Sequence, residues 1–295
     1  MVTGLHLAAG TLESDGHPVL LTPQAAGWTH AGLRVLRLEA GVPCEIQLGP
    51  FEAFVLPLSG ECIVDAGEQT FRLKGRQSVF ARVTDFAYVG RDTDMTLTSD
   101  AGAEIALPMA LADARRAPAY MAAEHVRVEV RGSGPATRQV NNFGVPGAFD
   151  GADRLMSCEV ITPGGNWSSY PPHKHDATCA VANEEIYYFR IAGRDGVSTS
   201  RQGFGVHRTY DDEIDMTVEV RDGDVCLVPR GYHGPSIAAP GYDMYYLNVL
   251  AGAGPERSMA FCDDPDHAWV RESWAGIPPD PRCPLTSATG RVAGT

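Results

Sequence analysis

Three histidines and one glutamate in the second half of the chain have types and spacing that could bind a metal ion. His173 and His175 are separated by one residue, and side chains two positions apart on a β-strand point to the same face. Glu185 opens an apolar run, and His233 ends a segment that begins at Gly223. Three imidazoles and one carboxylate suit zinc, iron, manganese, nickel or copper and leave coordination positions open for a substrate. The pattern is typical of a catalytic metal site.

Composition narrows the class of protein. With 295 residues, of which 44% are hydrophobic and 21% charged, the chain can form two globular domains. The net charge of −13 argues against nucleic acid and anionic membranes as partners, because both attract basic surfaces. No apolar stretch reaches the roughly 18–20 residues of a membrane helix. No basic residue precedes Arg34, so no presequence is visible and we expect a cytoplasmic protein.

The seven cysteines are scattered and never form a Cys-x-x-Cys pair. An odd number of dispersed cysteines in a chain of this length favours free, buried thiols over a disulfide framework. We therefore expect all seven to be structural thiols in a reducing compartment.

The regular elements that must position the ligands are short strands, because apolar and β-branched runs are broken throughout by Gly, Pro and Asp. In the first half we expect strands at 33–38, 44–49, 51–58, 61–65, 69–74, 78–83, 85–90, 95–99 and 104–108. In the second half we expect them at 125–131, 137–143, 154–162, 166–170, 184–192, 202–210, 214–221, 224–229 and 242–250. Such spacing predicts an all-β sandwich or barrel. The best helical candidate is Ala110–Ala123, between the two halves.

A weak internal repeat indicates two copies of one barrel. The segment Glu52–Gly60 parallels Glu185–Gly193, with the glutamate eight residues before the glycine in both. Further along, the repeat places Asp85 opposite His233, and the first half lacks the paired histidines. We therefore expect a metal site in the second barrel alone. The expected division is an N-terminal barrel at 1–123, a metal-binding barrel at 124–275 and a C-terminal tail at 276–295.

The metal-ligand spacing resembles the two signature motifs of the cupin superfamily, in which a double-stranded β-helix, or jelly roll, holds one metal ion. The resemblance implies a bicupin and identifies His173, His175 and His233 as ligands with one glutamate. Glu184 and Glu185 both remain open for that role. We take Glu185, because the ligand carboxylate of these motifs comes directly before the apolar strand.

Longer phrases, among them 170–176, 184–190, 223–233 and 239–252, are similar to the bacterial 5-deoxy-glucuronate isomerases of myo-inositol catabolism. The resemblance implies conversion of 5-deoxy-D-glucuronate to 2-deoxy-5-keto-D-gluconate, an aldose–ketose isomerisation. It also implies one divalent ion per chain, which we expect to be Zn, Mn, Fe or Ni. The ion would stabilise charge on the substrate oxygens, and the hydrogen would move through an enediol or as a hydride. The sequence leaves a homodimer as one possible assembly.

The types and positions of six further residues suggest roles in substrate binding or catalysis. A uronate substrate needs a cation for its carboxylate, and the substrate-binding candidates are Arg138, Arg190 and Arg208. The candidates for catalysis by proton transfer or contact are Lys174, Tyr187 and Tyr246.

Three other functions compete with this interpretation. A related ketol-isomerase acts on 5-keto-4-deoxyuronate, and cupin dioxygenases use the same ligand set for iron or copper. A sugar-binding or storage cupin would show no turnover. Sequence alone fixes neither the metal nor the catalytic base.

Overall fold

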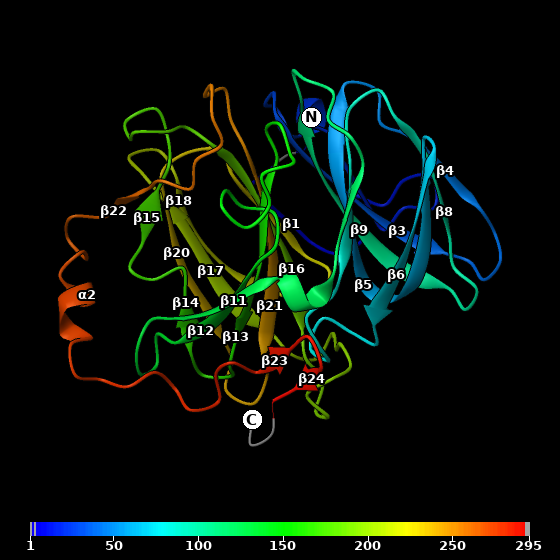
Figure 1. The fold of residues 1–295 in the computed structure, drawn as a ribbon. Helices are drawn as coiled ribbons and strands as arrows, with labels where there is room; N and C mark the ends of the chain where they lie inside the picture. Colours follow the sequence, from blue (N-terminus) through cyan, green and yellow to red (C-terminus); the bar gives the residue numbers. More distant parts are fainter. Residues whose placement is uncertain (1, 3, 293–295) are drawn as a thin grey trace.

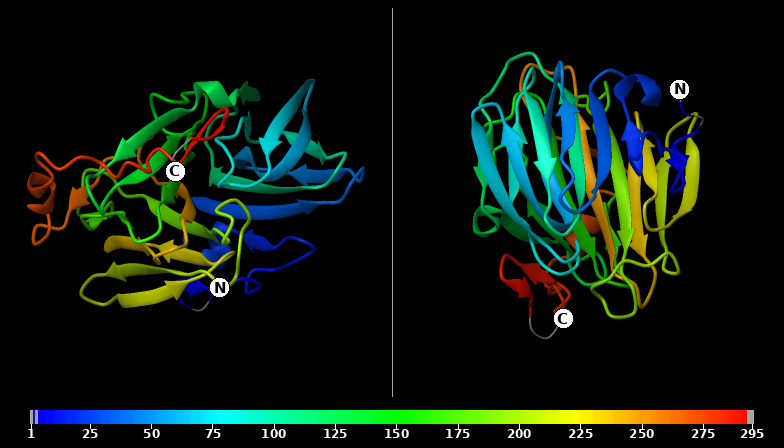
Figure 2. Two further views of the ribbon diagram at one scale, coloured as in Figure 1. Left: turned by 90° about the horizontal axis from the view of Figure 1, so that it is seen from below. Right: turned by 90° about the vertical axis from the view of Figure 1, so that its right-hand side faces the viewer.

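The computed structural model describes residues 2 and 4–292, and strands make up nearly all of its regular structure. Two antiparallel β-barrels lie side by side (Figures 1 and 2), the first coloured blue to cyan and the second green to orange. The helical elements are the short α1 (Pro23–Ala26), α2 (Val270–Ser273) and the 3-10 turn η1 (Ala123–His125). None of the helices in the described part of the chain is long and apolar enough to cross a membrane. The predicted all-β, two-barrel fold is confirmed.

The first barrel is organised around one long strand that takes part in both of its faces. On one face the strand order is β10-β7-β5-β9-β3-β2, and on the other β5 pairs with β6 and β8, while β8 pairs with β4. The strands are β2 (Val19–Leu21), β3 (Ala31–Leu38), β4 (Cys44–Gln47), β5 (Phe51–Ala66), β6 (Gln69–Arg76), β7 (Phe86–Val89), β8 (Asp94–Thr98), β9 (Ala103–Leu111) and β10 (Ala119–Met121). The sequence predicted β5 as two strands.

The second barrel consists of two sheets that face each other. One has the order β1-β19-β16-β21-β13-β12-β11, and the other has β18-β17-β20-β15-β22, with β14 beside β20. The first set is β1 (His6–Leu7), β11 (Arg127–Arg131), β12 (Arg138–Asn142), β13 (Met156–Thr162), β16 (Glu184–Ile191), β19 (Val225–Val228) and β21 (Met244–Ala251). The second set is β14 (Trp167–Ser168), β15 (His173–Lys174), β17 (Gly205–Tyr210), β18 (Asp215–Val220), β20 (Tyr232–Ala238) and β22 (Cys262–Asp263).

Segments from the ends of the chain cross the expected domain borders. β1 pairs with β19 of the second barrel, and His6 Nε2 lies 2.8 Å from Asp224 Oδ2. The last strands, β23 (Thr286–Ser287) and β24 (Gly290–Arg291), form a small hairpin, and the buried Thr286 is hydrogen-bonded to Gln139. The tail is therefore attached to the second barrel along its path.

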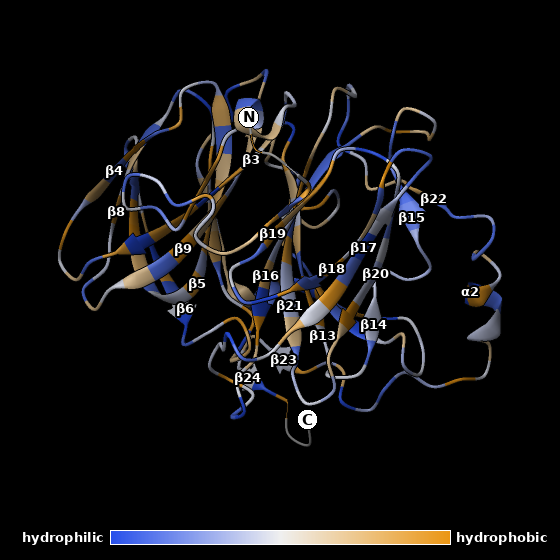
Figure 3. Ribbon diagram, turned by 180° about the vertical axis from the view of Figure 1, so that it is seen from behind, coloured by the Kyte–Doolittle hydropathy of each residue, from blue (hydrophilic) through white to orange (hydrophobic). Residues whose placement is uncertain are grey.

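Alternation along the strands separates three apolar cores. In β16, Tyr187 and Phe189 point into the second barrel, whereas Ile186 and Tyr188 pack between the barrels with Phe54 of β5. Both faces of these central strands are buried, so they form nearly continuous apolar runs. Figure 3 shows hydrophobic stretches along the strands of both barrels, interrupted by hydrophilic bands.

Two carboxylates join the barrels in a reciprocal manner. Glu184 of the second barrel accepts hydrogen bonds from the backbone N–H groups of residues 29–31, at 2.7–2.8 Å. Glu52 of the first barrel, fully buried, accepts them from the N–H groups of residues 153–155, at 2.5–2.8 Å. Glu52 therefore corresponds to Glu184, and the repeat predicted from sequence was shifted by one residue. The first-barrel counterpart of Glu185 is Ala53.

Several expectations about local structure were wrong, among them the strand at 78–83, where the chain forms a turn and a loop between β6 and β7. The segment predicted as a helix, Ala110–Ala123, instead contains the end of β9, a loop and β10, because these strands pair with β5 and β7. Sheet pairing outweighs the helix propensity of its alanines. Cys179 and Cys262 form a disulfide, so not all seven cysteines are free; β22 lies beside β15 and brings together residues 83 positions apart. The other five cysteines are free thiols.

Candidate metal centre

The four predicted ligands lie together inside the second barrel. His173 belongs to β15, and its register partner on β20 is His233. His175 follows β15 directly, and Glu185 is the second residue of β16. Glu185 Oε2 lies 2.8 Å from His175 Nε2 and 3.0 Å from His233 Nε2. The two sheets of the barrel thus bring their ligands to one point.

The donor atoms fit a metal ion. One atom each of His175, Glu185 and His233 falls within a span of 4.8 Å, and all three residues are buried. The ring of His173 lies beside this group, with its centroid 4.5 Å from that of His233. Neither ring nitrogen of His233 has a hydrogen-bond partner among the described residues, although the side chain is fully buried. Unpaired buried nitrogen atoms are costly, and coordination would satisfy one of them.

Hydrogen bonds to the outer side of the ligands fix their orientation. His175 Nδ1 donates to the carbonyl oxygen of Asn183 at 3.0 Å, and His173 Nδ1 donates to that of Pro171 at 3.3 Å. A carbonyl only accepts, so each Nδ1 carries a hydrogen and Nε2 is the ring nitrogen left for coordination. Asn248 of β21 donates to Glu185 Oε1 at 2.6 Å. The donor set is therefore held by backbone and amide groups.

The protonation states suit coordination. Burial alone would raise the pKa of Glu185, but the charge of His233 and the hydrogen bond and charge of His175 lower it well below its ordinary range. Burial and the neighbouring His233 hold the pKa of His173 well below its usual value. Burial also acts to lower the pKa of His175, yet its bond to Glu185 raises it overall. An ionised Glu185 and a neutral His173 are the forms that bind metals, and a bound ion would replace the hydrogen bond to Glu185 that raises the pKa of His175.

Glu184 is excluded from this group by its contacts. Both of its carboxylate oxygens are occupied by backbone N–H groups of the first barrel, as described above. Of the two glutamates, only Glu185 lies among the histidines, so Glu185 stays the predicted ligand.

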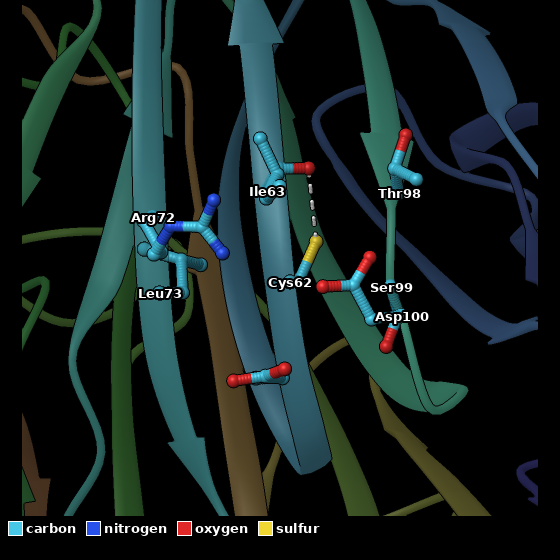
Figure 4. Close-up of a pocket in the computed structure, with 8 residues that line it drawn as sticks. Cys62, Ile63, Arg72, Leu73, Thr98, Ser99 and Asp100 are labelled. Carbon is cyan, nitrogen blue, oxygen red and sulfur yellow. Dashed lines mark hydrogen bonds between the residues drawn. The ribbon is translucent and has the colours of Figure 1, made fainter. Parts of the chain in front are cut away.

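A cavity of about 550 Å³ opens beside the cluster. Its walls include His173, His175 and Glu185, together with Tyr187 and Tyr246. This volume falls in the range of ligand pockets and is large enough for a sugar acid. A pocket in the first barrel differs in size and lining. The small pocket beside its Cys62 measures about 10 Å³, room for about one water, and no histidine lines it (Figure 4).

The two tyrosines share one hydrogen-bond partner. The hydroxyl groups of Tyr187 and Tyr246 each lie 3.1 Å from Ser169 Oγ. Burial raises the pKa of Tyr246 to about 12 and that of Tyr187 well above its ordinary value. Both tyrosines are therefore neutral hydroxyl groups at physiological pH.

Among the predicted substrate-binding arginines, only Arg138 lines the cavity. Its Nη1 donates to the carbonyl of Ala136 at 3.2 Å, and it has no carboxylate partner among the described residues. Burial lowers its pKa to about 10, so the group is still charged at neutral pH. By contrast, Arg131 and Arg271, which also line the cavity, are paired with Glu129 and Asp263.

Three other predicted residues lie outside the cavity. Arg190 forms ion pairs with Glu104 and Asp222 between the barrels. The guanidinium of Arg208 lies over the ring of Tyr210, at 3.9 Å. Lys174 Nζ lies 4.7 Å from the centre of the Tyr232 ring and points away from the cluster, as expected for the residue between two inward-facing histidines. These positions do not fit the roles in catalysis or substrate binding that the sequence suggested.

Sequence reasoning missed Asn248 and Ser169. Asn248 lies in β21, a strand of aliphatic and aromatic residues, between Leu247 and Val249. A buried amide in an apolar strand is a usable signal, because such groups need a partner. Ser169 precedes the motif in a loop and carries no comparable signal.

The described residues form two adjacent barrels, and the second barrel contains the His/Glu cluster. This arrangement defines a two-barrel protein of the cupin-like class. The chain belongs to the KduI/IolB family, whose model matches residues 6–270.

Named relatives cover most of the chain. It is 38% identical over 268 residues to a 5-deoxy-glucuronate isomerase of Geobacillus kaustophilus, covering 88% of this chain and 93% of that protein. The corresponding isomerase of Bacillus subtilis strain 168 is 35% identical over 259 residues, with 85% and 92% covered.

Solved structures agree. An IolB-like protein from Salmonella typhimurium LT2 has a TM-score of 0.82 at 31% identity, covering 91% of this chain and all of that one. The oxalate decarboxylase of Lactobacillus farciminis, with a TM-score of 0.63 at 12% identity and coverage of 94% and 97%, shares the fold alone.

Proposed function

We propose that this protein is an aldose–ketose isomerase that converts 5-deoxy-D-glucuronate to 2-deoxy-5-keto-D-gluconate in myo-inositol catabolism. The observation that carries the proposal is a cluster of three buried donor groups at a sugar-sized cavity, in a chain whose relatives over more than four-fifths of its length are named 5-deoxy-glucuronate isomerase.

The proposed cofactor is one divalent ion per chain, held by His173, His175, Glu185 and His233. Zn, Mn, Fe and Ni all suit this mixed nitrogen and oxygen donor set. When bound, such an ion withdraws electron density from the carbonyl and neighbouring hydroxyl oxygens of the substrate and so stabilises the charge that develops there.

The residues of the chain bind and orient the substrate around this point. Arg138 offers the substrate carboxylate a partly buried cation without a competing acid, and a guanidinium can bind a carboxylate with two parallel hydrogen bonds. The neutral hydroxyl groups of Tyr187 and Tyr246 donate to or accept from substrate oxygens.

The direct test is to supply purified, metal-loaded protein with 5-deoxy-D-glucuronate and follow ketose formation by NMR. We expect turnover in the wild type and its loss in His175→Ala, with the fold retained by circular dichroism. Arg208→Ala, which changes a side chain outside the cavity, is the matched control and should keep full activity.

Parallel assays separate the competing functions. A higher kcat/KM for 5-keto-4-deoxyuronate than for 5-deoxy-D-glucuronate would show that the proposed substrate is wrong. Oxygen uptake with a catechol or thiol would indicate a dioxygenase. Binding of the sugar acid without turnover would indicate a storage or binding protein. We keep the cytoplasm as the proposed compartment and a homodimer as the proposed assembly, to be tested by cell fractionation and light scattering.

A further inference from the structure

Ser169 has an unusual backbone conformation at the edge of the cavity. Its φ is +46°, in the left-handed region that favours glycine, and the side chain is 7% exposed. A non-glycine side chain is strained in this conformation, because its Cβ crowds the backbone. The conformation is enforced by packing. Gly234, next to His233, lies so close that an added Cβ would be 1.8 Å from the carbonyl oxygen of Ser169.

The retained side chain has a specific use in the structure. Ser169 Oγ lies 3.1 Å from the hydroxyl groups of both Tyr187 and Tyr246, and all three residues line the cavity. A glycine would fit this φ without strain but would leave the two tyrosines without a link. The three groups form one continuous row of hydroxyls, Tyr187–Ser169–Tyr246, which we call the hydroxyl row.

We propose that Ser169 is a positioning residue for the isomerisation, whose hydroxyl joins Tyr187 and Tyr246 into a relay that carries a proton between the two reacting oxygens of the substrate. The inference rests on the proposed function. In an aldose–ketose isomerisation the carbonyl oxygen becomes a hydroxyl and the neighbouring hydroxyl becomes a carbonyl. One proton must therefore leave one oxygen and one must reach the other.

The relay balances without an ionised tyrosine. The substrate hydroxyl gives its proton to the tyrosine at one end of the row, each hydroxyl passes its own proton onward, and the far tyrosine donates one to the other substrate oxygen. Four O–H bonds break and four form, and every member of the row ends neutral. The hydrogen on carbon moves separately.

Two variants of Ser169 separate the hydroxyl from the backbone. Ser169→Gly removes the hydroxyl and fits a positive φ, whereas Ser169→Ala removes the hydroxyl and keeps the strain. If the hydroxyl matters, both should lower kcat by about 10²-fold, with KM changed less than about threefold and metal content unchanged. Ser157→Ala is the control, since its buried hydroxyl donates to the backbone carbonyl of Asn248 outside the row.

A double-mutant cycle tests the row as a unit. Tyr246→Phe removes one end of the row, and in combination with Ser169→Gly it should reduce kcat no further than the stronger single change. Tyr246→Phe also keeps the test decisive if the Ser169 variants fold poorly.

Several outcomes would overturn the inference. Full kcat in Ser169→Gly with loss only in Ser169→Ala would show a backbone role alone. Additive losses in the double variant would show independent tyrosines. Either result leaves the proposed isomerase standing, because wild-type turnover is measured separately. A wild type that does not convert 5-deoxy-D-glucuronate would remove both.

Discussion

The central strands β7-β5-β9-β3 of the first barrel match β19-β16-β21-β13 of the second in order, but the interiors of the two barrels differ. With Glu52 matched to Glu184, the positions of Glu185 and Tyr187 in the second barrel are occupied by Ala53 and Val55 in the first. The same comparison along β9 and β21 sets Leu107 against Asn248. Ala53, Val55 and Leu107 all belong to the apolar core of the first barrel, and each is fully buried.

The difference shows how one fold serves two purposes. The first barrel fills its interior with apolar side chains, whose burial is worth about 25 cal/mol per Å². The second barrel buries less apolar surface in its interior, because polar groups and a cavity of about 550 Å³ occupy part of that space. Its polar groups are tolerated because Asn248, Asn183 and Pro171 supply partners for three of them. The apolar barrel thus supports the reactive one.

The largest effect should come from removing the carboxylate at the cluster. Glu185→Gln keeps the size of the side chain but loses the charge that binds the ion. We expect bound metal, measured by inductively coupled plasma mass spectrometry, and kcat/KM both to fall, the latter by about 10³-fold or more. Ala53→Ser, at the corresponding place in the first barrel, should leave both unchanged. Normal metal content in Glu185→Gln would contradict the assigned ligand set.

The reverse exchange should damage the first barrel. Ala53→Glu introduces a carboxylate into a dry core with no imidazole or amide to pair with it. An uncompensated buried charge costs about 3–5 kcal/mol, so urea unfolding should shift to a much lower midpoint. A midpoint equal to that of the wild type would mean that this interior is not as dry and filled as described.

Removing the unpaired cation of the cavity should weaken substrate binding. Arg138→Ala loses a charged hydrogen bond worth about 1.5–3 kcal/mol, so kcat/KM should fall about 10–100-fold, mainly through KM. Arg190→Lys, outside the cavity, should change stability more than KM. An unchanged KM in Arg138→Ala would place the substrate carboxylate elsewhere.

The smallest effect should be found at the contacts between the barrels. Glu184→Gln exchanges a charged acceptor of three N–H bonds for a neutral one, and the free energy of unfolding should fall by about 1–2 kcal/mol. Bound metal should be retained. If Glu184→Gln lost its metal, the choice of Glu185 over Glu184 would be wrong.

That these four side chains lie together could be predicted, because their chemistry leaves few alternatives. The spacing of His173 and His175 already places both rings on one face of a strand, and the type of Glu185 and His233 completes a donor set. Arg190 was misplaced because its type gave no hint that two acids from distant segments, Glu104 and Asp222, would pair with it between the barrels.

Strand β20, which carries His233, was missed as a strand. Gly231, Gly234 and Pro235 interrupt the apolar pattern and read as turn signals, yet pairing with β15 and β17 imposes an extended conformation. Asn248 and Ser169 could not be assigned roles, because each acts only through a partner that folding brings from another part of the chain.

The crossed carboxylates have a consequence for how such a molecule can evolve. Each barrel supplies the acceptor for three amides of the other, so one barrel expressed alone would expose three unpaired amides and one unpaired glutamate. The halves should then be recoverable only as a complementing pair of fragments. A barrel without a metal cluster can be retained in this way, because its loss would leave the other barrel with unpaired backbone amides.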